Sequence, residues 1–184
     1  AMHDTLTHFQ NHGVHQYDRI ALQMDRLKSD LSKLFGGSQN DYSFVPNTSF
    51  GINQIAHSIS WKPGDRILLL ENEFPTNVRP WLCSAECNGM ETVMLPVSQD
   101  SSRNPLDLDA LESVLKSGIR LMALSAVQFQ TGKRMPLNEI YTLCQKYNTL
   151  LFVDAIQACG ALPFDGQRYD FWVSGGHKWM LGPE

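Results

Sequence analysis

The sequence predicts an α/β fold in which helices cover both faces of a mainly parallel sheet, the three-layer αβα arrangement. Short apolar segments alternate along the chain with segments of helical periodicity, the order expected when crossover helices join parallel strands. The short segments are apolar at successive positions, as expected of strands that are buried on both faces. Polar residues or glycines follow these strands, at the sheet edge where ligands of such folds bind.

The first part of the chain is expected to be an arm followed by a helix. Residues 3–16 are polar, hold four of the six histidines and show no regular apolar period, so we expect an irregular arm there. Residues 17–35 place apolar side chains at helical spacing, and the glycines at positions 36 and 37 end that helix.

The rest of the chain alternates. Further helices are expected at residues 48–60, 75–87, 107–116 and 137–147. Strands are expected at residues 42–45, 66–70, 91–95, 120–124, 150–153 and 171–173. The helix over residues 48–60 has Ile52, Ile55, Ala56 and Ile59 on one face, and a turn at residues 62–65 separates it from the next strand.

The composition is that of an ordinary globular protein, with 42% hydrophobic and 18% charged residues in a chain of 184. The formal net charge of -4 gives no reason to expect nucleic acid as a partner. Apolar runs such as residues 150–153 are far too short to span a bilayer, so we expect no membrane association.

The four cysteines do not have the spacing of a metal site. Cys83 and Cys87 stand four apart on an expected helix and share a face, but two ligands do not make a structural zinc site. No metal is therefore expected. Free thiols that mostly pack against neighbours are typical of a cytoplasmic protein, which is the compartment we expect.

The last segment of the chain, residues 171–183, carries the chemistry around which the other motifs are arranged. It joins a short apolar strand to a glycine pair and a single lysine, Lys178, in otherwise apolar surroundings. Burial of an ammonium is costly, so a lysine held there tends to lose its proton or to form an imine with a carbonyl. The best known partner of this kind is the aldehyde of pyridoxal phosphate. The alternative is a lysine that extends to the surface.

Two polar residues follow the strand at residues 150–153. Asp154 comes directly after a buried strand and is suited to pair with a protonated ring nitrogen, or else it caps the following turn. Gln157 stands three residues on and would reach an oxygen of the same ring.

Other strand ends offer further groups. Thr48 and Ser49 stand at the start of a helix, where free N–H groups and the helix dipole bind phosphate; the alternative is a helix cap made by Asn47 or Thr48. Phe74 follows a strand and would stack on a flat ring, or else is a core residue before Pro75. The later loop that includes Ser125 is polar, either as a ligand contact or simply as a loop.

These motifs, in this order, resemble the pyridoxal-phosphate enzymes of fold type I, and specifically the class V aminotransferase and cysteine desulfurase-like group. The specific pieces are the Asp154-x-x-Gln157 pair and the segment SGGHKW at residues 174–179. The resemblance implies that Lys178 forms a Schiff base with the cofactor, that Asp154 binds its pyridine nitrogen and that Gln157 binds its phenolic oxygen. It also implies the following contacts: Thr48, Ser49 and His177 at the phosphate, and Phe74 on the ring.

Some positions depart from the pattern of this group. Desulfurases usually have His at the stacking position, where this chain has Phe74, so the likeness favours an aminotransferase-like or lyase-like member over a cysteine desulfurase. Many members carry an Asn where this chain has Phe129 and a Ser where it has Gly175, although Ser174 is adjacent.

Members of the group are roughly twice as long, so the resemblance implies that this chain is a truncated member. Residues 1–40 would form an N-terminal arm and helix, and residues 41–184 part of the large cofactor-binding domain, without the small C-terminal domain. The group acts on amino acids and builds its sites in homodimers. The chain alone is expected to be inactive; a silent binding or dimerisation domain remains an alternative, whereas a nucleotide site is disfavoured because no GxGxxG or GxxxxGK[ST] motif is present.

Overall fold

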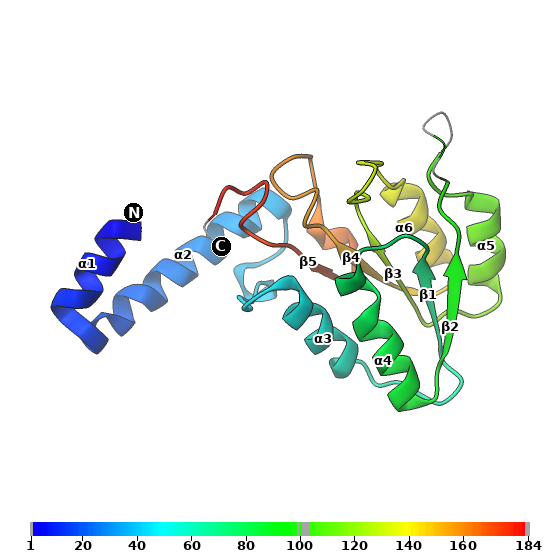
Figure 1. Cartoon of the computed structure of the whole chain (residues 1–184), viewed down its shortest axis with the longest axis horizontal. Coiled ribbons are helices and arrows are strands. Elements are labelled where there is room, and N and C mark those ends of the chain that lie inside the picture. The colour runs from blue at the N-terminus through cyan, green and yellow to red at the C-terminus, as the bar shows by residue number, and fades with distance from the viewer. Residues whose placement is uncertain (1, 99, 101–103, 183–184) are drawn as a thin grey trace. The chain divides into compact units, whose positions relative to one another are not determined.

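The structure is a computed structural model that describes residues 2–98, 100 and 104–182 (Figure 1). The chain divides into two compact units, Ala1–Phe44 and Val45–Glu184.

The first unit is helical. It contains α1 (Met2–His12), a 3₁₀ turn at Gly13–Gln16, α2 (Tyr17–Phe35) and a 3₁₀ turn at Gln39–Asp41. The helix over residues 17–35 is confirmed, whereas the irregular arm at residues 3–16 is wrong. Asp4 in the first turn of α1 and His12 in the last suit the helix dipole, which an apolar period does not reveal.

The strand expected at residues 42–45 is wrong as well. Tyr42 has extended backbone angles, but this segment pairs with no strand of the described chain. Instead the Tyr42 hydroxyl donates to the carbonyl of Gly36 at 2.6 Å, which ties the segment to the end of α2. A short apolar run predicts a strand only when a partner strand is available, and periodicity cannot show that.

The second unit alternates strands and helices, as the sequence predicts. Its helices are α3 (Thr48–Ser58), α4 (Arg79–Asn88), α5 (Leu108–Lys116) and α6 (Leu137–Lys146), with 3₁₀ turns at Pro75–Asn77 and Gly166–Arg168. Its strands are β1 (Arg66–Leu70), β2 (Glu91–Leu95), β3 (Leu121–Ser125), β4 (Leu150–Asp154) and β5 (Phe171–Val173).

Within the described residues, the five strands form one sheet in the order β2-β1-β3-β4-β5, and each neighbouring pair is parallel. The strand order reverses between β1 and β3, because the chain moves outward from β1 to β2 and then returns to β3 on the other side. In open α/β sheets, ligands bind beyond the carboxyl ends of the strands at such a reversal.

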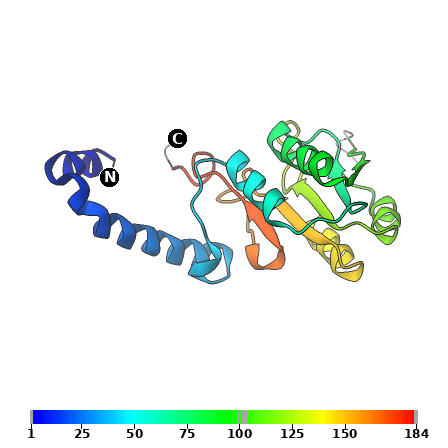
Figure 2. The ribbon, with the colours of Figure 1, turned by 90° about the horizontal axis from the view of Figure 1, so that it is seen from below.

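Helices cover both faces of the sheet, which confirms the three-layer αβα fold. Helices α3 and α4 lie on one face and α5 and α6 on the other (Figures 1 and 2). On the first face, buried side chains of α3, α4 and the strands form one core cluster: Ile52, Ala56, Ile67, Leu69, Trp81, Leu121, Ala123, Phe152 and Val173. Since alternate strand residues are buried on the opposite face too, the apolar runs reflect burial on both sides.

One predicted helix is divided in two. Residues 75–87 were expected to form a single helix, but a 3₁₀ turn at Pro75–Asn77 precedes α4. Proline has no N–H to donate, so it is tolerated in the first turn of a helix but not in the interior. Pro80 lies in the first turn of α4, which is why α4 begins at Arg79 and not at Pro75. None of the described helices combines the length and the apolar character that crossing a bilayer requires.

Candidate functional site

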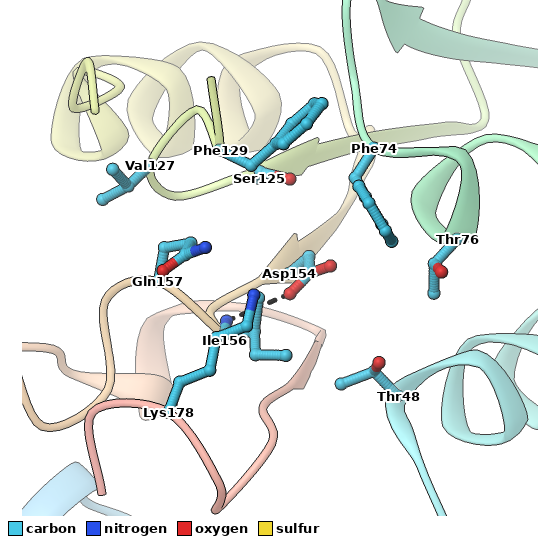
Figure 3. A pocket seen from close by; sticks show the side chains of 10 residues that line it. All are labelled: Thr48, Phe74, Thr76, Ser125, Val127, Phe129, Asp154, Ile156, Gln157 and Lys178. Carbon is cyan, nitrogen blue, oxygen red and sulfur yellow. Dashed lines mark hydrogen bonds between the residues drawn. The ribbon is translucent and has the colours of Figure 1, made fainter. Parts of the chain in front are cut away.

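A cavity opens at the carboxyl edge of the sheet, at the reversal of strand order (Figure 3). It receives side chains from the start of α3 and from the segments that follow β1, β3, β4 and β5. The lining residues are Thr48, Phe74, Thr76, Ser125, Val127, Phe129, Asp154, Ile156, Gln157 and Lys178. The parallel sheet thus brings together residues that are as far apart in sequence as Thr48 and Lys178.

The structure brings most of the predicted site residues together. Thr48, Phe74, Asp154, Gln157 and Lys178 all line this cavity. In particular, the lysine and the aspartate face one space, and the charge of Lys178 is close enough to lower the pKa of Asp154. Both groups therefore face the space that a bound ligand would occupy.

Two predicted residues do not line the cavity. The Ser49 hydroxyl is directed to the Thr76 hydroxyl at 3.4 Å and is only partly buried. The His177 side chain is exposed, and its ring folds back over Gly175, where an added Cβ would lie 2.8 Å from the ring atom Cε1. The predicted phosphate contacts of these two residues stay predictions.

Asp154 is the last residue of β4 and is only 4% exposed. One carboxylate oxygen accepts a hydrogen bond from the Ile156 N–H at 3.0 Å, so the residue caps the following turn and also lines the cavity (Figure 3). Burial raises the pKa of Asp154 to about 6, and the Glu73 carboxylate adds to that rise. The Ile156 N–H and Lys178 act in the opposite direction.

Lys178 lies on the loop after β5 and its side chain extends toward Asp154 (Figure 3). The expectation that this lysine is buried is wrong, because residue 178 is exposed. The loop closes on itself through a hydrogen bond from the Gly182 N–H to the Gly176 carbonyl at 2.7 Å. Its apolar residues Trp179 and Leu181 are exposed too, so they do not cover the lysine.

Gln157 is held by a residue for which the sequence suggested no role. The Trp179 indole N–H donates to the amide oxygen of Gln157 at 2.9 Å. An indole can only donate, so it binds the oxygen and leaves the amide NH₂ group free to turn elsewhere. Figure 3 shows the nitrogen end of Gln157 on the side nearer Asp154. Gln157 is therefore placed to donate a hydrogen bond to an oxygen in the cavity.

Two aromatic rings form one wall of the cavity. Phe74 and Phe129 meet edge to face, with ring centroids 5.1 Å apart. Phe74 is 47% exposed, so it is not a core residue, and the alternative considered for it is wrong. An exposed ring face beside a polar cavity is suited to cover a flat heterocycle.

The start of α3 supplies polar groups on the opposite side. The Asn47 side chain caps α3 by accepting from the Phe50 N–H at 2.8 Å, so Asn47 rather than Thr48 is the cap. Thr48 is left to line the cavity beside Thr76. A helix N-terminus with two hydroxyls nearby is a suitable place for an anion such as a phosphate.

Glu73 is a site residue that the sequence reasoning missed. It lies three residues after the end of β1, is 9% exposed, and accepts hydrogen bonds from Ser125 of the cavity wall. The sequence could not single it out, since Glu71 stands two residues earlier with the same chemistry and is exposed. Only the fold shows which of the two is buried.

Comparison with known proteins gives one family. The family model described as "Aminotransferase class-V" matches residues 2–184. A cysteine desulfurase from Escherichia coli is 31% identical over 180 residues, and one from Serratia proteamaculans is 30% identical over 178. Each of these alignments covers 93% of this chain and 43% of the relative, so the chain spans less than half the length of the curated relatives it matches.

Solved structures give the same result. A complex of a cystine C-S lyase with cysteine persulfide superimposes with a TM-score of 0.86 at 25% identity, covering 97% of this chain and 49% of the lyase. A variant of that lyase, with glycine covalently linked to its PLP cofactor, has the same TM-score and identity. An apo cysteine desulfurase from Thermococcus onnurineus gives a TM-score of 0.81 at 26% identity, covering 94% and 43% of the two chains.

Proposed function

Because this chain belongs to the class V aminotransferase family, we propose that its cavity binds pyridoxal phosphate and serves an enzyme that transforms an amino acid. Pyridoxal phosphate is the cofactor of this family. The observation that carries the proposal is that Lys178 and Asp154 line one cavity although they are 24 residues apart in the sequence.

The groups that line the cavity fit the cofactor. Its aldehyde requires an amine, which Lys178 supplies, and its ring nitrogen requires an acid, which Asp154 supplies. Its ring oxygen would accept from the Gln157 amide, and its flat ring would lie against Phe74. The phosphate would take the polar corner at Thr48, where the start of α3 is positive.

When bound, pyridoxal phosphate supplies an aldehyde that takes up an amine and a ring that accepts electrons. Lys178 Nζ would hold the aldehyde carbon, and the same amine would be the base placed to move a proton at the Cα of an amino-acid substrate. Asp154 would keep the ring nitrogen protonated, which makes the ring the better electron acceptor. Phe74 and α3 would hold the ring plane and the phosphate, so that the reacting atoms stay aligned.

Two types of reaction are candidates for this protein. An aminotransferase-like or lyase-like reaction is favoured by Phe74, which replaces the histidine usual in desulfurases. Cysteine desulfurization is the second candidate, because the relatives at 30–31% identity are cysteine desulfurases. The cystine C-S lyase among the structural neighbours belongs with the lyase-like candidate. Assay of the protein with alanine, cysteine and cystine, scoring oxo-acid and sulfide, separates these reactions.

Borohydride reduction tests the cofactor proposal directly. Incubation with pyridoxal phosphate should give a visible absorbance band, and reduction should fix the cofactor on the peptide that contains Lys178, as read by mass spectrometry. Lys178→Ala should lose both signals, because no amine then faces the aldehyde. Lys146→Ala is the matched control, since Lys146 is exposed on α6 and pairs with Glu112 at 2.6 Å. Labelling that persists in Lys178→Ala contradicts the proposal.

Two further parts of the proposal concern the setting of the protein. We infer from the family resemblance that it acts as a homodimer, which sedimentation would test. The four cysteines are free, two exposed and two buried, which supports a reducing, cytoplasmic compartment.

A further inference from the structure

A second buried carboxylate, Glu73, lies behind the cavity wall and has no part in the function proposed above. We propose that Glu73 is a positioning residue that turns the Ser125 hydroxyl into an acceptor and adds negative charge beside Asp154, so that the cavity holds a heterocycle in its ring-protonated form. The inference rests on the proposed function in one respect, because the heterocycle in question would be the pyridine ring of the cofactor.

Glu73 is bound to Ser125 at two points. One carboxylate oxygen accepts from the Ser125 N–H at 2.8 Å, and the other accepts from the Ser125 hydroxyl. The second oxygen also accepts from the Asn77 side-chain amide at 3.2 Å. These bonds satisfy a buried carboxylate, and they join the segment after β1 to the last residue of β3.

The bond to Glu73 decides what Ser125 can offer to a ligand. A serine hydroxyl has one hydrogen, and here that hydrogen is directed to the glutamate. Only oxygen lone pairs then remain for the cavity, which Ser125 lines. Ser125 is also the register partner of Asp154 in the adjacent strand. This part of the wall therefore presents acceptors alone, a carboxylate and a hydroxyl oxygen, which suits a ring N–H.

The charges around Asp154 act in the same sense. The titratable groups that face it are Glu73 after β1, Lys178 after β5 and Cys159 in the segment after β4. Burial raises the pKa of Glu73, while bonds from Ser125 and Asn77 oppose the rise. The negative charge of Glu73 raises the pKa of Asp154, and it would raise the pKa of a nitrogen base bound beside Asp154 for the same reason.

The far end of the network provides a matched control. Trp81 is fully buried, and its indole N–H donates to the Asn77 oxygen at 3.3 Å. Trp81→Phe removes one hydrogen bond from the same network but changes no charge and leaves Ser125 untouched. A purely structural role of the network predicts similar effects of Glu73→Gln and Trp81→Phe, whereas the proposal predicts different ones.

The experiment titrates a bound probe rather than activity. Pyridoxamine phosphate labelled with ¹⁵N in the ring is bound to the wild type, Glu73→Gln and Trp81→Phe, and its ring nitrogen is followed by NMR against pH. Glu73→Gln should lower the pH at which the ring loses its proton by about one unit, the size expected for one nearby charge. Trp81→Phe should leave that midpoint unchanged.

An unchanged midpoint in Glu73→Gln overturns this inference while the proposed function stands. A wild-type protein that binds no probe overturns the proposed function and this inference with it. If Glu73→Gln does not fold, as judged by circular dichroism, Ser125→Ala provides the second test. It keeps the charge and removes the acceptor, so probe affinity should fall about three- to tenfold for one lost hydrogen bond; unchanged affinity also overturns the inference.

Discussion

Some residues of this site lower the stability of the fold while they serve ligand binding, and Asp154 is the clearest example. Burial raises the pKa of its carboxyl from 3.8 to about 6 in the folded protein. Because this pKa is raised in the folded state, folding favours the protonated form of Asp154. The contribution of the protonated carboxyl to the free energy of unfolding is therefore fully present below about pH 4 and is lost as pH rises toward 6. Above that range the buried charge costs roughly 3 kcal/mol, the energy of about two pKa units.

Asp154→Asn should therefore stabilise the cofactor-free protein at pH 8. The amide oxygen of Asn can still accept from the Ile156 N–H, so the turn is kept, while the buried charge is removed. We expect the free energy of unfolding in urea to exceed that of the wild type by roughly 1–3 kcal/mol at pH 8, and by much less at pH 4. A variant that is less stable than the wild type at pH 8 contradicts the burial argument.

Trp179 offers a prediction at the surface of the same site. Trp179→Phe keeps an aromatic ring and removes the N–H that orients Gln157, so the affinity for pyridoxal phosphate should fall about two- to tenfold. Equilibrium dialysis measures this without reference to turnover.

The effect should vanish in a background that lacks the Gln157 amide. In Gln157→Leu, replacing Trp179 by Phe should change the affinity no further, because there is no amide left to orient. Equal losses in both backgrounds would show that Trp179 acts by another route.

At the scale of elements, two loops of the site are held together by close backbone approach. Gly160 lies after β4 with φ +91°, and a Cβ added there would lie 2.5 Å from the carbonyl oxygen of Trp179. That carbonyl belongs to the loop that carries Lys178. Because glycine has no Cβ, Gly160 allows the segment that contains Gln157 and the loop that carries Lys178 to approach this closely.

Gly160→Ala should lower the free energy of unfolding by roughly 2–4 kcal/mol, because backbone strain and a clash with backbone act together. Gly118→Ala is the control: its φ is +92°, but nothing lies within 4 Å of an added Cβ. It should cost only the strain, about 1 kcal/mol. Equal losses in thermal or urea unfolding would mean that the approach to Trp179 does not matter.

The sequence predicted elements well where the local pattern is clear. Strands β1 and β2 and helix α2 have the predicted bounds, since β1 is a continuous apolar run, β2 is a short segment between two loops, and α2 has a regular helical period even though only Phe35 of it is buried. Prediction failed at residues 42–45, where pairing decides, and at α1, where charge placement replaces an apolar period. Pro80 could have predicted a new helix start near residue 79, but the apolar period over residues 75–87 favoured a single helix.

The site was predictable to the extent that it depends on chemical type. Asp154, Gln157 and Lys178 were found because unusual side chains follow strands, and the fold brings them to one cavity. Glu73, Trp179 and the exposure of Lys178 depend on which side chains meet in space, and no spacing rule contains that information. His177 and Ser49 show the converse, since adjacency in sequence did not bring them to the cavity.

At the scale of the whole molecule, the curated relatives extend well beyond the region that matches this chain, which covers 43% of their length. The cavity described here is formed within the second unit, and Lys178 and both phenylalanine rings are partly open in it. Cofactor binding is therefore the property to measure first, and turnover the second.

Every strand of this sheet runs the same way, and the reacting groups come at or beyond the strands' final residues. The part of the polypeptide that secures folding is thereby separated from the part that performs chemistry. Residues of the loops can therefore be substituted one loop at a time while the sheet keeps its fold, so a change of reaction does not require a change of fold.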